Sequence, residues 1–441
     1  MFLASYNRRS SRFRVLELLN LSPALAESLA AAARAVGAVL SGGSLTAALE
    51  ALHPRTLRAA AQDLAHNALR GYGLVDAVLE KLLERPLTEP ALQGLLLASL
   101  GELINRPQSA HTVVHQAVEA ATLLGQPRAR GLVNAVLRNF LRRGETLRAA
   151  IEDTETGRLH HPQWWIDRVR AAYPDQWEGM LAAANGHPPM TLRVNLRRCS
   201  VEHYVERLAA AGMPARWLGG TAVVLERPCR IDALPGFREG EVSVQDKGAQ
   251  AAAPLLDVQP GMRVLDARAA PGGKASHLLE LTDCDLLAVD LSRERAARIE
   301  ENFVRLGLKG DVRVADALQP GTFWDGRPFD RILADVPCSA SGVVRRHPDI
   351  RWLRRETDLA GFASQQARML ESLWRLLLPG GTLLYATCSV FPEENGRQVR
   401  GFLRRHPAAL AVPLAGLVDG QILPGAETDG FYYALLHKNQ P

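Results

Sequence analysis

The chain has 441 residues, of which 47% are hydrophobic and 22% are charged. At about 150 residues per domain this length predicts roughly three domains, each with enough apolar side chains for a buried core. The composition excludes a disordered chain, and the lack of an apolar run of about 18 residues predicts no membrane span. The net charge of +5 is compatible with a polyanionic partner but indicates one only if the charge is concentrated on one surface.

The cysteines and the N-terminus bear on the cellular location. Five scattered cysteines form neither a disulfide framework nor a zinc-binding pattern, so we expect a reducing, cytoplasmic compartment and no bound metal. No long apolar segment follows the N-terminal arginines, which predicts no secretory signal and leaves a transit peptide as the alternative. These arginines are Arg8, Arg9, Arg12 and Arg14.

The first third of the chain has the periodicity of helices. Apolar residues recur at helical spacing over residues 74–85, which end before Pro86, and again over residues 133–141. No strand-like alternation interrupts residues 10–145. We therefore predict an all-α domain over residues 1–148.

One of these helices is predicted to be apolar on the inside and basic on the outside. Residues 128–143 contain five arginines and no acidic residue, at positions other than the apolar ones. A solvated face is the alternative, but we favour a surface that contacts the phosphates of RNA. The predicted RNA-binding residues are Arg128, Arg130, Arg138, Arg142 and Arg143.

Residues 149–245 are broken by prolines into short elements. We predict a strand over residues 191–196, a helix over 201–209 and a strand over 222–225, which together make a small α+β domain. Three arginines beside the first strand either touch nucleic acid or are solvated charges at a strand edge. They are Arg193, Arg197 and Arg198.

Residues 246–441 alternate strands with helices, which predicts a parallel sheet with crossover helices. The strand over residues 263–266 leads into a glycine-containing loop that opens a helix, where backbone N–H groups favour a carboxylate or phosphate. Arg268 and Ala275 exclude a P-loop, and the dinucleotide-binding glycine pattern is absent. The predicted ligand-binding loop comprises Arg268, Ala269, Ala270, Pro271, Gly272, Gly273 and Lys274.

Three further predicted strands each end at an acidic residue: residues 286–289 before Asp290, 312–315 before Asp316 and 331–334 before Asp335. A single Asp after a strand is usually a turn residue or a helix cap. Asp290, however, lies 24 residues beyond Asp266, the spacing of an acid that binds ribose hydroxyls. Together with the loop, the three acids predict an S-adenosylmethionine site.

Two cysteines directly follow predicted strands. Cys338 follows the strand that ends at Asp335, and Cys388 follows a fifth strand over residues 382–386. Most unpaired cysteines are small buried hydrophobes, but this position favours chemistry instead. Carbon C5 of a pyrimidine is a poor nucleophile until a thiolate adds to C6. The attacking thiol must be ionised, and the residues alone do not say which of the two attacks.

At these residues the chain resembles a known family. The segments DARAAPGGK, DVPCSASG and YATCSVFPEEN are similar to the motifs of the Sun/Fmu superfamily of RNA 5-methylcytosine methyltransferases. The helical segments SAHTVVHQAVEAA and RARGLVNAVLRNFLRR resemble the NusB-like domain of the bacterial small-subunit ribosomal RNA methyltransferase B subfamily. The resemblance covers nearly the whole chain.

The resemblance implies a NusB-like RNA-binding domain over residues 1–148, a ferredoxin-like connecting domain over 149–245 and a Rossmann-like class I methyltransferase core over 246–441. It further implies methyl transfer to a cytidine of 16S ribosomal RNA, either naked or in an early assembly particle. In this superfamily the residue matching Cys388 is the nucleophile and the residue matching Cys338 assists product release. Asp335 is expected to contact the target base and, with residues 268–274, Asp290 and Asp316, to form the cofactor site.

The chain departs from the family at Ala267 and Arg268, where a Leu-Cys or Ala-Cys pair is usual. Arg268 adds bulk and charge beside the cofactor loop, which puts cofactor affinity rather than chemistry in doubt. Three alternatives stay open: attack by Cys338, as in DNA cytosine-5 methyltransferases; a non-catalytic RNA-binding assembly factor; and the same chemistry on transfer RNA or another RNA.

Overall fold

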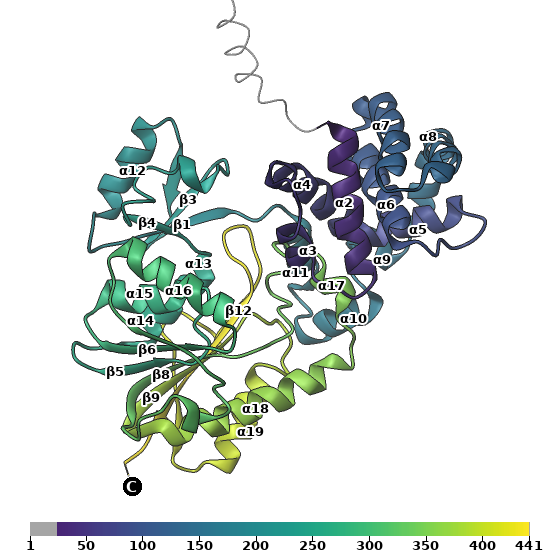
Figure 1. The fold of residues 1–441 in the computed structure, drawn as a ribbon. Coiled ribbons are helices and arrows are strands. Elements are labelled where there is room, and N and C mark those ends of the chain that lie inside the picture. The colour runs from purple at the N-terminus through teal and green to yellow at the C-terminus, as the bar shows by residue number, and fades with distance from the viewer. Residues whose placement is uncertain (1–23, 441) are drawn as a thin grey trace, which may run out of the picture. The chain divides into compact units, whose positions relative to one another are not determined.

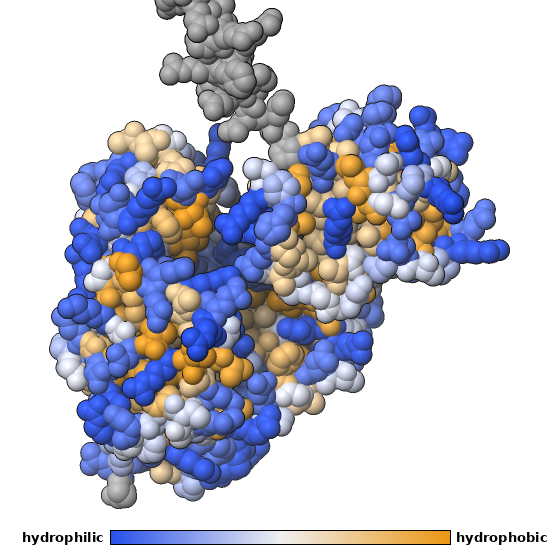
Figure 2. Space-filling view, in the orientation of Figure 1, coloured by the Kyte–Doolittle hydropathy of each residue, from blue (hydrophilic) through white to orange (hydrophobic). Residues whose placement is uncertain are grey.

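The computed structural model describes residues 24–440, which form two compact units. The first unit runs to His160 and includes His347–Asp349, and the second contains the remaining residues. The N-terminal arginines considered above lie outside the described residues. Hydrophilic side chains cover most of the face seen in Figure 2, interspersed with smaller apolar areas. Within residues 24–440, every helix is too short or too polar to cross a membrane.

The described part of the first unit is helical, as predicted. Helix α2 is rich in alanine and is almost wholly buried. It packs so closely against α6 that a Cβ atom at Gly94 would lie only 2.4 Å from the carbonyl oxygen of Ala33. The helices are α2 (Leu25–Leu40), α3 (Leu45–Glu50), α4 (Arg58–Arg70), α5 (Tyr72–Leu82), α6 (Pro90–Asn105), α7 (Ala110–Leu123), α8 (Arg130–Glu152) and α9 (Glu155–Leu159), with 3₁₀ turns at Arg55–Leu57, Pro107–Ser109 and Pro127–Ala129.

Helices α5 and α8 confirm the two helices predicted from periodicity. The predicted apolar positions Val133, Val136, Leu137 and Phe140 of α8 are buried, whereas Leu141 is exposed. The five predicted RNA-binding arginines on or just before the helix are exposed. Residue 148, the predicted end of the helical domain, lies inside α8, and the compact unit continues to His160.

The second unit begins with α10 (Gln163–Ala172) and α11 (Trp177–Asn185), followed by the small α+β domain. Its antiparallel sheet has the order β2-β3-β1-β4. The strands are β1 (Met190–Val194), β2 (Ala215–Trp217), β3 (Ala222–Leu225) and β4 (Val242–Val244), and the helix is α12 (Val201–Ala210). Periodicity predicted β1, α12 and β3, but β2 and β4 are only three residues long and were not identified.

The methyltransferase-like core is an eight-stranded sheet with the order β10-β12-β9-β8-β5-β6-β7, in which β11 also pairs with β12. Strands β9 to β7 are parallel, and the C-terminal strands are antiparallel. The strands are β5 (Arg263–Asp266), β6 (Asp285–Asp290), β7 (Asp311–Val314), β8 (Phe329–Asp335), β9 (Leu377–Thr387), β10 (Ala409–Val412), β11 (Gln421–Ile422) and β12 (Phe431–Lys438). All five predicted strands of this region are confirmed, whereas the antiparallel addition was not foreseen.

Helices cover both faces of this sheet (Figure 1). Successive strand residues point to opposite faces, so Val264 packs with α14 to α16 while Leu265 packs with α18 and α19. The helices are α13 (Lys247–Gln250), α14 (Ala252–Leu256), α15 (Gly273–Leu281), α16 (Arg293–Leu306), α17 (Ile350–Leu353), α18 (Asp358–Leu376) and α19 (Gly396–Arg405), with 3₁₀ turns at Ile231–Ala233 and Pro320–Thr322.

The strand order reverses at the centre of the sheet. From β5 the chain adds β6 and β7 on one side and then β8 and β9 on the other. In open α/β sheets ligands bind at this reversal, beside the carboxyl ends of the strands. The topology therefore directs attention to the ends of β5, β8 and β9.

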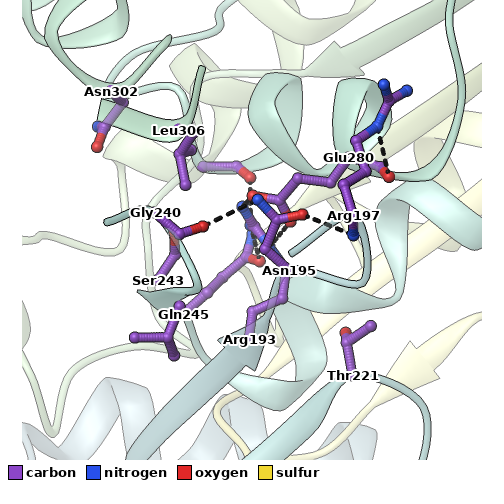
Figure 3. Close-up of polar contacts among 12 residues, drawn as sticks. Arg193, Asn195, Arg197, Thr221, Gly240, Ser243, Gln245, Glu280, Asn302 and Leu306 are labelled. Atoms are coloured by element: carbon purple, nitrogen blue, oxygen red, sulfur yellow. Dashed lines mark hydrogen bonds and ion pairs between the residues drawn. The ribbon is translucent and has the colours of Figure 1, made fainter. Parts of the chain in front are cut away.

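A buried ion pair joins the α+β domain to the core (Figure 3). Arg193, on β1, is fully buried and donates from two nitrogens to the two carboxylate oxygens of Glu280 on α15, at 2.8 and 2.7 Å. Its third nitrogen donates to the carbonyl of Gly273 at 2.6 Å and to the side chain of Gln245 at 2.5 Å. Both interpretations of Arg193 from sequence are therefore wrong, because it is neither at an RNA surface nor a solvated strand-edge charge.

The neighbouring arginines also form hydrogen bonds between the α+β domain and the core. Arg197 donates to the carbonyl of Glu280 and pairs with Asp283 at 2.8 Å, and Arg198 donates to the carbonyl of Leu306. The Arg197–Asp283 pair is exposed, at 36% and 91% of the two side chains, whereas the Arg193–Glu280 pair is buried.

We predict that Arg193→Met lowers the free energy of unfolding by about 3–5 kcal/mol, because it leaves the carboxylate of Glu280 buried without its partner. Arg197→Met is the matched control and should cost no more than about 1 kcal/mol, since its pair is exposed. Combining Arg193→Met with Glu280→Leu should recover much of the loss. Denaturant unfolding followed by circular dichroism measures these changes; equal effects of the two single substitutions would contradict the assignment.

Candidate active site

The predicted ligand-binding loop leaves β5 and opens α15 at the centre of the sheet. Gly272 has φ +98°, a conformation that suits glycine, and a Cβ atom there would lie 3.2 Å from the Cα of Ile299. The N–H of Ala269 donates to the carbonyl of Val289 at 2.9 Å, which fixes the loop against β6. The loop therefore presents backbone close to any ligand at the start of α15.

Asp290 ends β6 and is buried beside this loop. Its Oδ2 accepts a hydrogen bond from the backbone N–H of Ala270 at 3.2 Å and pairs with Arg295 at 3.3 Å. Its Oδ1 accepts from the N–H of Ser292 at 3.1 Å. Asp290 thus holds the predicted ligand-binding loop in place. It also lies at the position predicted for the acid that binds ribose.

Asp266, at the end of β5, belongs to the same cluster and was not predicted as a site residue. Burial and the charge of Asp335 raise the pKa of Asp266 to about 7. Its Oδ2 is buried and finds no hydrogen-bond partner among residues 24–440, so it is available to a ligand. The signal in the sequence was an acid at the end of the central strand, directly before the loop.

Lys274 and Asp335 connect the loop to the end of β8. The Nζ of Lys274 donates to Oδ2 of Asp335 at 2.6 Å. Burial lowers the pKa of Lys274, but Asp335, Tyr433 and Cys388 together raise it, so the net pKa lies above its ordinary value. Lys274 is therefore held as a cation at the end of β8, where it also interacts electrostatically with Cys388.

The two cysteines that follow β8 and β9 lie together. The Sγ atoms of Cys338 and Cys388 are 3.4 Å apart, because the parallel register pairs Asp335 with Ala386. The hydrogen bond to Cys388, burial and neighbouring negative charge raise the pKa of Cys338 well above its ordinary value. Cys338 is therefore held in its protonated form.

The other cysteines lie away from this pair. Cys199 and Cys229 pack against the core of the α+β domain, and Cys284 precedes β6, at the opposite end of the parallel strands from Asp290. Burial raises the pKa of Cys284 to about 11. None of the five is in a disulfide.

Two predicted cofactor residues have local roles. Asp316 is half-buried two residues beyond β7, and its Oδ1 accepts from the N–H of Leu318 at 2.9 Å, as a turn residue does. Arg268 is half-buried, and its N–H donates to Asp266 at 3.4 Å. The roles of both toward a cofactor stay predictions.

The predicted RNA-binding arginines all lie exposed on or just before α8. Arg130 pairs with Glu119 at 2.7 Å and Arg138 donates to Asn134 at 3.0 Å. These two arginines line a cavity of about 650 Å³ between α7 and α8. A basic outer face on α8 is therefore present, although one of its charges is already paired.

Within residues 24–440, His, Cys, Asp and Glu side chains form no group of three that could hold a metal ion. The acids at the strand ends are instead accompanied by Lys274 and Arg295.

Three family models match successive parts of the chain. Residues 24–142 match the NusB family, residues 161–232 match the RsmF/B-like ferredoxin-like domain, and residues 253–437 match the 16S rRNA methyltransferase RsmB/F family. The class of protein is thus a methyltransferase core preceded by a ferredoxin-like and a NusB-type domain, and the predicted fold class is confirmed.

Full-length relatives narrow this class. The chain is 43% identical to ribosomal RNA small subunit methyltransferase B of Pseudomonas syringae pv. tomato, over 92% of this chain and 96% of that one. It is 44% identical to the protein of the same name from Pseudomonas putida, over 92% and 98%. A methyltransferase homologue from Pyrococcus horikoshii of known structure shares 28% identity with a TM-score of 0.57, covering 64% of this chain and 97% of that one. The chain therefore belongs to the ribosomal RNA small subunit methyltransferase B family.

Proposed function

We propose that the protein transfers a methyl group from S-adenosylmethionine to carbon C5 of a cytidine in 16S ribosomal RNA, through a covalent adduct between Cys388 and carbon C6. The observation that carries the proposal is the 3.4 Å separation of the two thiols beside an ion-paired lysine. A base amine could be methylated without any thiol, whereas C5 needs one. The proposal places the enzyme with ribosomal RNA in the cytoplasm.

The residues around the loop fit S-adenosylmethionine. The start of α15 offers backbone N–H groups for the carboxylate of the methionine end, and the unpartnered oxygen of Asp266 offers an acceptor for its amine. Asp290 stands where an acid accepts hydrogen bonds from ribose hydroxyls, and Asp316 lies further along the same edge, on the adenine side. When bound, S-adenosylmethionine supplies the methyl group.

The chain's own residues prepare the base. Asp335 accepts a hydrogen bond from the exocyclic amine of cytosine, which uracil lacks, and so helps to select the base. Lys274 lies close enough to Cys388 for the two side chains to interact electrostatically.

The Cys388 thiolate adds to C6, and the electron pair released to C5 takes up the methyl group, whose bond to the sulfonium sulfur breaks. Solvent water then takes the C5 proton, and the electron pair of the C5–H bond re-forms the double bond and expels the Cys388 thiolate from C6. Cys338, which stands against Cys388, assists this last step.

The exposed arginines of α8 provide a second contact with RNA. Phosphates bind arginine without regard to base, so this surface contributes affinity rather than choice of nucleotide. A transfer RNA substrate would leave the chemistry unchanged; the NusB-type domain and the names of the relatives favour ribosomal RNA.

Asp290→Ala should weaken S-adenosylmethionine binding by about 1.5–3 kcal/mol, since hydrogen bonds to a charged group are lost. Isothermal titration calorimetry measures the affinity. Asp311→Ala, which removes an exposed acid at the start of β7, is the control and should bind like the wild type. Unchanged affinity for Asp290→Ala would remove this residue from the cofactor site.

The double substitution Arg138→Glu with Arg142→Glu should weaken RNA binding and flatten its dependence on log salt, by about 0.7–0.9 for each phosphate that the protein no longer binds. Affinity for S-adenosylmethionine should not change. Binding isotherms at several salt concentrations measure the slope. An unaltered slope would identify the cluster as a solvated face.

The roles of Cys388 and Cys338 can be distinguished by the covalent RNA adducts that their Ala variants form. Cys388→Ala should abolish methylation and any RNA adduct, because C5 never becomes nucleophilic. Cys338→Ala should still attack and transfer the methyl group, and should then accumulate protein bound to RNA. Denaturing gels with substrate RNA and S-adenosylmethionine show this as a slowly migrating band.

A band with Cys388→Ala and none with Cys338→Ala would make Cys338 the nucleophile. No adduct and no methylation in the wild-type protein would instead favour a non-catalytic assembly factor.

A further inference from the structure

The two loops that carry the thiols share one buried carboxylate, that of Glu394. Its side chain is fully buried, and its Oε1 accepts a hydrogen bond from the backbone N–H of Ser339 at 2.7 Å. Its Oε2 accepts from the hydroxyls of Ser339 and Ser389, both at 2.5 Å. Ser339 directly follows Cys338, and Ser389 directly follows Cys388. One carboxylate therefore binds the residue next to each thiol.

Further hydrogen bonds make the two loops a single unit. The hydroxyl of Ser341 lies 3.1 Å from that of Ser339 and 3.0 Å from that of Ser389. The N–H of Gly342 donates to the carbonyl of Cys388 at 2.8 Å. A displacement of one loop would therefore displace the other.

Glu394 is itself held from two sides. Gln366, on α18, donates from Nε2 to Oε1 of Glu394 at 3.0 Å and to the carbonyl of Pro337 at 2.9 Å. The hydroxyl of Tyr385, on β9, donates to the carbonyl of Glu394 at 2.6 Å. The carboxylate is thus fixed to the helix and strand that flank the loops.

The backbone of the first loop is strained. Ala340 has φ +59°, in the left-handed region that residues with a side chain rarely adopt. Such a conformation persists where the surrounding contacts over-determine it, and it is typical of functional loops. The bonds that Glu394 makes to Ser339, the residue before Ala340, are among the contacts that hold this loop.

We propose that Glu394 is a positioning residue that sets the spacing of Cys338 and Cys388, so that both thiols act in turn on one base. The inference rests on the proposed function in that the thiols react with RNA. Burying a carboxylate is costly even when it is fully hydrogen-bonded, so stability alone does not account for a carboxylate at this position. What an apolar side chain cannot do is bind three donors from two loops at once.

The negative charge of Glu394 also distinguishes the thiols. It adds to the hydrogen bond with Cys388 and to burial in raising the pKa of Cys338. Cys338 therefore retains its proton when Cys388 attacks.

The spacing of the thiols can be measured without RNA. The probe is a full-length protein in which Cys199, Cys229 and Cys284 are replaced by Ser, treated with the diazo oxidant diamide. The two remaining thiols lose two protons and two electrons to form a disulfide, and the N=N bond of diamide is reduced to a hydrazine. Mass spectrometry of unreduced peptides gives the rate of cross-linking between Cys338 and Cys388.

Glu394→Ala should slow this cross-linking about tenfold. In the protein with all its cysteines, the same substitution should lower kcat about 100-fold, because a misplacement of the reacting groups by about 1 Å has an effect of this size. The KM for S-adenosylmethionine should not change. Glu394→Gln should restore most of the cross-linking rate, because the hydroxyls of Ser339 and Ser389 can accept from an amide N–H. Glu393→Ala is the matched control, since Glu393 pairs with Arg168 and Arg397 and not with either loop.

A wild-type cross-linking rate and kcat in Glu394→Ala would overturn the proposal. If that variant fails to fold, Ser389→Ala is used instead, because it keeps the carboxylate of Glu394 and removes only its bond to the second loop. Slower cross-linking in Ser389→Ala supports the proposal, and a wild-type rate overturns it. Cross-linking needs no RNA, so it tests the positioning role separately from the proposed function. If the wild-type protein forms no RNA adduct, the proposed function is refuted. If Glu394→Ala still slows cross-linking in that case, the positioning role remains supported.

Discussion

The parallel pairing of β8 with β9 determines where Cys338 and Cys388 meet in this protein. The register sets Asp335 opposite Ala386, so the chain reaches Cys338 three residues after one strand position and Cys388 two residues after the other. Two thiols from segments 50 residues apart therefore meet at 3.4 Å. The reversal of strand order between β5 and β8 then brings the loop of Lys274 to the same edge.

Polar contacts fix the details that hydrophobic packing leaves open. Apolar burial holds the helices on the sheet but has no preferred direction. Hydrogen bonds are directional, and the loss of one in a buried site is costly. The Arg193–Glu280 pair therefore fixes the α+β domain against α15, and Glu394 fixes the two loops that carry the thiols. Under the proposed function, one set of bonds steadies the helix that begins at the predicted cofactor loop, and the other sets the spacing of the two sulfurs.

The sequence predicted the five parallel strands and placed Cys338 and Cys388 directly after two of them, because strand periodicity suffices for both. The short strands β2 and β4 carried too little local signal, and the antiparallel position of β12 depends on its pairing with the distant strand β9. Arg193 and Glu394 could not be interpreted from sequence, since Arg193 meets Glu280 87 positions away and Glu394 meets Ser339 55 positions away, pairings that only the folded chain creates. The exposed arginines of α8 stay a prediction, because exposure alone does not distinguish a phosphate-binding face from a solvated one.

The central claim is that the protein methylates carbon C5 of a cytidine in 16S ribosomal RNA through a covalent adduct between Cys388 and carbon C6. Bisulfite sequencing of ribosomal RNA tests it most directly, because 5-methylcytosine resists conversion to uracil. A strain that lacks the gene should lose one protected cytidine in 16S ribosomal RNA, the wild-type gene should restore it, and a gene encoding Cys388→Ala should not. Protection that persists in the strain without the gene, or that the Cys388→Ala protein restores, would contradict the account.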